Sequence, residues 1–234
     1  MIKPLQLPLL IMILLFVSCQ KKISDLEFEK NVMTEIFPSL IDSTCYDSRI
    51  TFSKPPIYGQ ENCDLEGHII SIDSTKGTEE QKQKIEEWKR NQGEIEKDTS
   101  KIIIAFNPEI EKSNEDLKGY LEQYFKGAKS FYPIVEGDST NIIDFKNIPI
   151  KHRFELRNIS EFPKDKYEFW RKKYDFVFSG AVFFTRIQFD KDKKFGVLDG
   201  GFSCGRHCGN GFRIYIKKRG EKWVIDKIEE TSVA

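Results

Sequence analysis

The chain lacks most of the motifs by which catalytic and cofactor sites are recognised. Its 234 residues contain no P-loop, no Gly-x-Gly-x-x-Gly fingerprint, no His-Glu-x-x-His pair and no EF-hand loop. Neither a Cys-x-x-Cys redox pair nor a Cys-x-x-Cys-His haem attachment site occurs. We therefore predict no catalytic residue, no cofactor and no metal ligand, and we favour a binding or structural role over an enzymatic one.

An excess of charge of either sign is also missing. Lys and Arg together number 37, and Asp and Glu also number 37. Such a balance provides no overall field to attract nucleic acid, so no nucleic-acid partner is expected. The hydrophobic share of 39% and the charged share of 32% are typical of a globular protein. The length is enough to bury a core, and we expect a single domain over residues 25–234.

The longest apolar run is too short to cross a bilayer. It extends from Leu9 to Val17, whereas a spanning helix needs roughly 20 apolar residues. Lys3 gives a positively charged start, and Ser18 places a small residue after the run, in the order of an export signal. Phe16-Val17-Ser18-Cys19 resembles the lipobox of bacterial lipoproteins. That resemblance implies that residues 1–18 are a lipoprotein signal peptide and residues 19–24 a tether.

The lipobox resemblance implies a location and a partner. Acyl chains such as palmitate on Cys19 would hold the domain at a lipid bilayer without a spanning helix. Phe16 stands where the lipobox usually has Leu, and the alternative is an ordinary secretory peptide with Cys19 as a spare thiol. Gln20 is not the Asp that retains some lipoproteins at the inner membrane. We therefore expect the bacterial cell envelope, and within it the outer membrane.

The remaining cysteines favour disulfides. When Cys19 is set aside, four are left: Cys45, Cys63, Cys204 and Cys208. An even number in an oxidising compartment indicates disulfide bonds. Three pairings are possible, of which the local one, Cys45 with Cys63 and Cys204 with Cys208, is the simplest. An all-cysteine zinc site and lone reactive thiols are the less favoured alternatives.

The hydrophobic patterns predict an α+β fold. Strands are expected wherever short apolar or alternating runs occur: His68 to Ile72, Lys101 to Phe106, Phe131 to Val135, Ile142 to Phe145 and Lys151 to Arg157. Helices are expected over residues 24–44, 78–98, 113–126 and 163–173, with a capping box at Thr78 and a kink or helix junction at Pro38. Residues 178–228 are typical of a four-stranded antiparallel meander. Helices followed by a meander favour α+β over α/β.

A second resemblance concerns the C-terminal third. Cys204-Gly205-x-x-Cys208-Gly209-x-Gly211, followed by Gly220-x-x-Trp223, resembles the C-terminal signature of a broad set of uncharacterised bacterial lipoproteins. Phe37-Pro38-x-Leu40-Ile41-Asp42-Ser43 with Asp47-x-Arg49 is similar to their N-terminal region. The match covers less than half of the chain, and the Cys-Gly motif is its only specific part. The family has no assigned activity, so the resemblance implies only a cystatin-like or nuclear-transport-factor-like arrangement of helices packed on a sheet.

The glycine-rich segment contains two further candidate sites. Residues 201–205 match the Gly-x-Ser-x-Gly nucleophile elbow, but an elbow needs a helix after its serine and a strand is expected here, so an esterase is disfavoured. The glycines of residues 205–211 are candidates for a backbone nest for an anion, with Arg206 and His207 beside them. We favour the simpler explanation that these glycines adopt positive φ in a tight, disulfide-closed turn.

Together these patterns predict a membrane-anchored envelope lipoprotein that binds an unknown protein or small-molecule ligand without catalysis. The alternative is an envelope hydrolase whose site one sequence does not reveal. A deep pocket with convergent carboxylates or histidines would favour the hydrolase. Exposed clusters of aromatic residues would favour a binding protein.

Overall fold

Helix α2, Asp25–Thr44, begins the described part of this computed structural model, which comprises residues 23–51, 54–129, 131–132, 141–150 and 153–233. The Ser24 hydroxyl caps α2 by accepting a hydrogen bond from the Glu27 amide. The helix continues through Pro38, so the alternative of two helices that meet there is wrong. The predicted signal peptide, Cys19 and most of the predicted tether lie outside the described residues.

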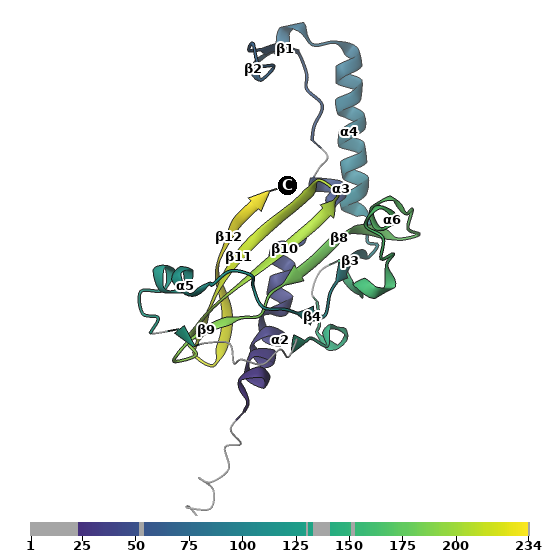
Figure 1. The fold of residues 1–234 in the computed structure, drawn as a ribbon. Helices are drawn as coiled ribbons and strands as arrows, with labels where there is room; N and C mark the ends of the chain where they lie inside the picture. Colours follow the sequence, from purple (N-terminus) through teal and green to yellow (C-terminus); the bar gives the residue numbers. More distant parts are fainter. Residues whose placement is uncertain (1–22, 52–53, 130, 133–140, 151–152, 234) are drawn as a thin grey trace, which may run out of the picture.

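A mixed eight-stranded sheet forms the centre of the fold. Six strands follow one another in the order β12-β11-β10-β8-β3-β7, and β9 and β5 extend the sheet beside β10 (Figure 1). The bounds are Ile102–Phe106 for β3, Phe131–Tyr132 for β5, Phe154–Asn158 for β7, Val177–Phe184 for β8, Gln188–Asp190 for β9, Phe195–Gly205 for β10, Cys208–Arg219 for β11 and Lys222–Val233 for β12.

The predicted antiparallel meander is present as β8, β10, β11 and β12. Its first predicted strand is divided, because residues 185–187 separate β8 from β9 and both strands pair with β10. Strand β3 is buried along its whole length, as its continuous apolar run predicts. It lies parallel to both β7 and β8, which makes the sheet mixed. The α+β class is confirmed.

Helices cover both faces of the sheet. Helix α2 packs on one face, where Phe37 and Leu40 join the largest core cluster with Phe106 and Phe202. The opposite face has two smaller clusters, one under α5, Lys118–Tyr124, and one under α6, Lys166–Arg171. Both helices are shorter than the ranges predicted for them.

The short elements connect these layers. Strands β4, Glu109–Ile110, and β6, Asn141–Ile142, pair with each other. The 3-10 turns η2, Phe145–Asn147, and η3, Ile159–Glu161, flank β7 along the chain. The strands predicted over residues 131–135 and 142–145 thus correspond to the two-residue strands β5 and β6, and residues 133–140 lie outside the described part.

A buried ion pair fastens α2 to the sheet. The Arg186 guanidinium donates to the Glu29 carboxylate over 2.7 Å, and the Ile187 amide donates to the other carboxylate oxygen over 2.8 Å. The side chains of Glu29 and Arg186 are only 4% and 6% exposed. Because both groups are buried, removal of either one would leave charge in the interior that water does not solvate.

Residues 54–98 project from the rest of the molecule, and we call them the arm and the remaining described residues the body (Figure 1). The arm contains strands β1, Gln60–Cys63, and β2, Ile69–Asp73, the 3-10 turn η1, Ser74–Lys76, and helix α4, Glu79–Lys97. The predicted capping box at Thr78 is present. None of the residues of α4 is buried.

The two ends of the arm meet at the body. The short helix α3, Ser48–Thr51, leads into the arm, and Arg49 bridges Asp47 at 2.8 Å and Asp98 at 2.6 Å. The Ser100 hydroxyl and, next, the Arg49 guanidinium hold the pKa of Asp98 well below its usual range. These contacts fix the point from which the arm projects.

Candidate functional site: a basic pocket beside the disulfide hairpin

The Cys204–Cys208 disulfide closes the hairpin between β10 and β11. The two Cα atoms are 5.2 Å apart, and Arg206 and His207 form the turn between the strands. The Tyr46 hydroxyl lies 3.2 Å from the Cys204 sulfur, so the disulfide also contacts the segment that follows α2. The predicted pairing of these two cysteines is confirmed, and bonded sulfurs do not serve as zinc-binding thiolates.

The other two cysteines are not joined. Cys45 is buried in the body at the end of α2, whereas Cys63 is exposed on β1 of the arm. Burial raises the pKa of the Cys45 thiol to about 12. The simplest predicted pairing, Cys45 with Cys63, is therefore absent, because the chain between them leaves the body to form the arm.

The glycines of the hairpin do not have the backbone conformation that we predict from the sequence. Glycines with positive φ occur at positions 59, 67, 180 and 220, whereas Gly205, Gly209 and Gly211 belong to extended strands. A Cβ on Gly209 would lie 3.0 Å from the Phe202 carbonyl oxygen, and one on Gly211 would lie 2.6 Å from the Ser232 hydroxyl. These glycines permit close approach of neighbouring strands, and the positive-φ explanation is wrong.

A pocket of about 380 Å³ lies between α6 and this hairpin, on the face of the sheet opposite α2. Its floor consists of small residues from β8, β10 and β11: Ala181, Ser203, Gly205, Cys208 and Gly209. Its apolar wall comes from the segment around α6: Ile159, Pro163, Phe169 and Trp170. The small floor residues leave the space that larger side chains would fill.

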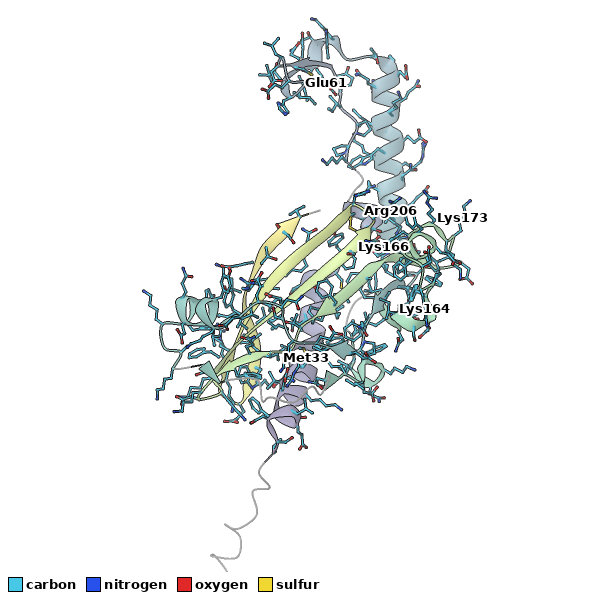
Figure 2. All side chains as sticks on the ribbon, in the orientation of Figure 1. Met33, Glu61, Lys164, Lys166, Lys173 and Arg206 are labelled. Carbon is cyan, nitrogen blue, oxygen red and sulfur yellow. A yellow bond between two sulfur atoms is a disulfide. The ribbon has the colours of Figure 1, made fainter. Side chains whose placement is uncertain are left out.

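The rim of the pocket is basic. Lys164, Lys166 and Arg206 line it, and no carboxylate is among the described residues of the lining. Figure 2 shows these three side chains at the α6 end of the sheet. Within the described part of the chain, none of the three has an ion-pair partner. The Arg206 guanidinium instead lies 4.4 Å from the centre of the Tyr167 ring, which holds it by a cation–π contact.

The acidic residue nearest to these lysines in the sequence forms hydrogen bonds with backbone amides. Asp165 lies between the two lysines, but its carboxylate accepts hydrogen bonds from the Tyr167 and Glu168 amides and so caps α6. This cap positions Lys166 in the first turn of the helix. The pocket therefore combines three cations with an apolar wall, an arrangement suited to an anion with an apolar part.

Ser203 lies on the pocket floor without the surroundings of a nucleophile. It belongs to β10, which continues through the disulfide hairpin into β11, so no helix follows the serine. As far as the structure describes the chain, the pocket lining includes no histidine and no carboxylate to act as a base. The nucleophile-elbow match therefore lacks the strand-to-helix turn that the motif requires.

The sequence identified part of this pocket. It placed Arg206 and the hairpin glycines beside a candidate anion site, but His207 does not line the pocket. Lys164, Lys166 and Trp170 were missed. The lysine-rich stretch from Pro163 to Lys173 was the only feature of the sequence that could have indicated them. Such a stretch has the same pattern as any solvent-exposed helix.

In the described residues, no group of three or more His, Cys, Asp or Glu side chains is placed to hold a metal ion. No described helix is long and apolar enough to cross a membrane. Comparison of the chain with protein-family models, with curated proteins and with solved structures gave no match. The resemblance to uncharacterised lipoproteins and the cystatin-like or nuclear-transport-factor-like arrangement therefore stay predictions.

Proposed function

We propose that this chain is an envelope lipoprotein, held at the outer membrane through acylated Cys19, whose body binds an anionic ligand in the pocket between α6 and the disulfide hairpin. The observation that carries the binding proposal is the rim of Lys164, Lys166 and Arg206, none of which has an ion-pair partner among the described residues. Three unpaired cations around one hollow attract negative charge and repel positive charge.

The wall of the pocket defines the ligand further. Trp170 and Phe169 offer aromatic surface beside the cations, and Ile159 and Pro163 add aliphatic surface. The volume of about 380 Å³ is within the usual range for small-molecule sites. We infer a ligand that joins a phosphate, sulfate or carboxylate to a ring or short apolar group.

A hydrolase at this position has less support. Hydrolysis needs a group that transfers protons at the reacting bond, and the lining residues that the structure describes include no carboxylate and no histidine. Binding needs only the charges and the apolar wall that are present.

Trp170 provides a direct test of ligand binding. We expect titration with phenyl phosphate to change the tryptophan fluorescence of residues 20–234, and the change to disappear in the Trp170→Phe variant. Phenol and inorganic phosphate should each bind more weakly than phenyl phosphate, because each lacks one of the two complementary parts. Equal binding of all three, or binding of none, would refute the proposed ligand class.

The cations can be tested with a matched control. Lys164→Gln with Arg206→Gln should lower the affinity for phenyl phosphate by about tenfold or more, or about 1.4 kcal/mol. Lys173, which follows α6 and is labelled in Figure 2, lines a different hollow. Lys173→Gln should leave the affinity unchanged, and an equal loss in this variant would indicate only general electrostatic attraction.

The membrane tether needs a separate test. Expression of the full chain in a bacterial host should place the protein in the outer-membrane fraction, and the mass of its N-terminal peptide should show acyl chains on Cys19. Cys19→Ser should release the protein into the soluble fraction. Recovery of the unaltered chain in the soluble fraction would refute the tether without affecting the pocket.

A further inference from the structure

The hairpin of β1 and β2 at the end of the arm has an exposed apolar surface. Every residue from Gln60 to Ile72 is exposed. Leu65 at its tip is 106% exposed, and Ile70 on β2 is 69% exposed, with Ile69 and Ile72 close to half exposed. Several exposed aliphatic side chains on one projecting hairpin indicate an interaction surface.

The same hairpin is acidic. Residues 60–73 contain Glu61, Asp64, Glu66 and Asp73 but no lysine or arginine. Asp64 holds the turn, since its carboxylate accepts from the Glu66 and His68 amides over 2.9 Å each. The hairpin therefore presents Leu65 between two acidic residues, in a turn of defined shape. A surface that receives it must combine an apolar hollow with positive charge.

The body has a surface with these complementary properties. The pocket beside α6 has an apolar wall and a basic rim, and residues 163–173 contain five basic but only two acidic residues. Tyr167 on α6 is 55% exposed beside Arg206 and adds apolar surface. One molecule thus contains both an acidic apolar projection and a basic apolar hollow.

The hairpin does not reach the pocket of its own molecule. Helix α4 separates the hairpin from the body, and its 19 residues span about 28 Å at the usual helical rise. Gln81 fixes the hairpin to the far end of α4, because its side-chain amide both donates to and accepts from the Gly59 backbone. Figure 1 shows the hairpin well away from the sheet.

The charges also decide between two arrangements of a dimer. A two-fold contact between two hairpins would bring eight acidic residues together, since each contributes four. Like charges opposed in this way disfavour association. A head-to-tail contact instead brings the acidic hairpin of one copy to the basic pocket of another.

We propose that the β1–β2 hairpin of one molecule docks in the basic pocket of a second copy, with Leu65 against the apolar wall and Glu61 and Glu66 beside the basic rim. This inference rests on the pocket of the proposed function, and it identifies the hairpin of a second copy as the partner that binds there. Because the two contacting surfaces differ, the contact forms rings or open chains of molecules.

Sedimentation velocity on residues 20–234 tests the assembly. We expect association that increases with protein concentration in the range of about 1–100 μM and weakens as salt rises. Leu65→Ser combined with Glu66→Lys should abolish it. Glu87→Lys, which adds the same charge change on exposed α4, should not. A monomer at every concentration in low salt would overturn the proposal.

Charge exchange then identifies the two surfaces. Glu61→Lys with Glu66→Lys gives a hairpin variant, and Lys164→Glu with Lys166→Glu gives a pocket variant. Each alone should remain monomeric, whereas a mixture of the two should associate. If the pocket variant associates like the natural chain, the contact does not use the pocket and the proposal fails.

Cross-linking locates the contact. Cys63 on β1 accepts a thiol-directed photo-cross-linker because it is exposed, whereas Cys45 is buried. With equal amounts of ¹⁴N- and ¹⁵N-labelled protein, we expect mixed-isotope cross-links from Cys63 to residues 153–173. Cross-links confined to one molecule would contradict docking in a second copy.

Phenyl phosphate separates this inference from the proposed function. The hairpin variant should bind phenyl phosphate as the natural chain does, and phenyl phosphate should dissociate the assembly of the natural chain. If the small anion binds and no assembly forms, the docking inference fails while the proposed function stands. If the assembly forms through the pocket and the small anion does not bind, the proposed small-molecule ligand fails.

Discussion

The arm and the body are stabilised in different ways. The body buries entire elements: strand β3 has no exposed residue, and Phe37, Phe106 and Phe202 are almost inaccessible to water. The arm buries almost nothing, since no residue of α4 is buried and every residue from Gln60 to Ile72 is exposed. The body therefore depends on packing, and the arm depends on local interactions.

Local interactions stabilise the arm. In the capping box, the Thr78 hydroxyl accepts from the Gln81 amide and the Gln81 side chain accepts from the Thr78 amide, and Lys84 pairs with Glu80 at 2.7 Å one turn away. Each such contact is worth only about 0.3–1 kcal/mol. An element held in this way opens more easily than a packed core. The arm is suited to present a surface, and the body to hold a site in shape.

The largest expected effect concerns the body. Glu29→Ala should lower the free energy of unfolding by about 3–5 kcal/mol, because it removes the carboxylate that the buried Arg186 guanidinium contacts at 2.7 Å. Urea unfolding measures the loss. Glu27→Ala, an exposed change on the same helix, should stay within about 0.5 kcal/mol of the natural chain. The double change Glu29→Met with Arg186→Leu should recover most of the loss, and a failure to do so would show that packing, not charge, dominates there.

The disulfide comes next. Replacement of Cys204 and Cys208 by serine should cost about 2 kcal/mol, since the closed loop is short and the entropy it removes from the unfolded chain is small. Because Cys208 lies on the pocket floor, the same variant should also bind phenyl phosphate more weakly. Thermal unfolding and fluorescence titration measure the two effects. Cys63→Ser, in the arm, should change neither.

Gly59 tests the arm alone. Its φ is +122°, and an added Cβ would lie 2.6 Å from the Asp73 carbonyl oxygen. Gly59→Ala should therefore destabilise the hairpin by about 1–2 kcal/mol. Hydrogen exchange should become faster in residues 60–73, while urea unfolding of the body should not change. A matching loss in the body would mean that the two regions unfold as one unit.

The smallest expected effect is at the junction of the two regions. The pKa of Asp98 is lowered by the Ser100 hydroxyl and by Arg49, so its contribution to stability is complete above the usual Asp pKa and is lost as the pH falls through the lowered value. Proteolysis of the arm should accelerate below about pH 4. Asp98→Asn should show the faster cleavage at neutral pH and less dependence on acid. A steep acid dependence that persists in this variant would assign the effect to other carboxylates.

The same contrast explains what the sequence could predict. The continuous apolar run of β3, the alternation in β11 and the capping box at Thr78 are local signals, and each led to a correct element. Strand β1 was missed because Gln60-Glu61-Asn62-Cys63 has no apolar alternation and is a strand only through its pairing with β2. The disulfide between Cys45 and Cys63 was wrongly predicted for the same reason, because without β1 nothing indicates that Cys63 lies in the arm.

Most of the pocket could not be predicted, for a different reason. Its floor comes from β8, β10 and β11 and its cations from the α6 segment and the hairpin turn, which are far apart in the sequence. The parallel pairing of β3 with β7 and β8, likewise, joins Ile102 to Phe154 and Val177, which lie 52 and 75 positions further along the chain. Such non-local contacts leave no periodic signal in a single chain.

The contact between Arg49 and Asp98 has a consequence for the history of the gene. Because these residues meet at 2.6 Å, the chain leaves the body and returns to it at one place. Segments with adjoining ends are the ones most readily gained, lost or exchanged without damage to the surrounding fold. Relatives of this protein with arms of other lengths, or with only a short turn between α3 and β3, are therefore to be expected, each with the same sheet and a different reach.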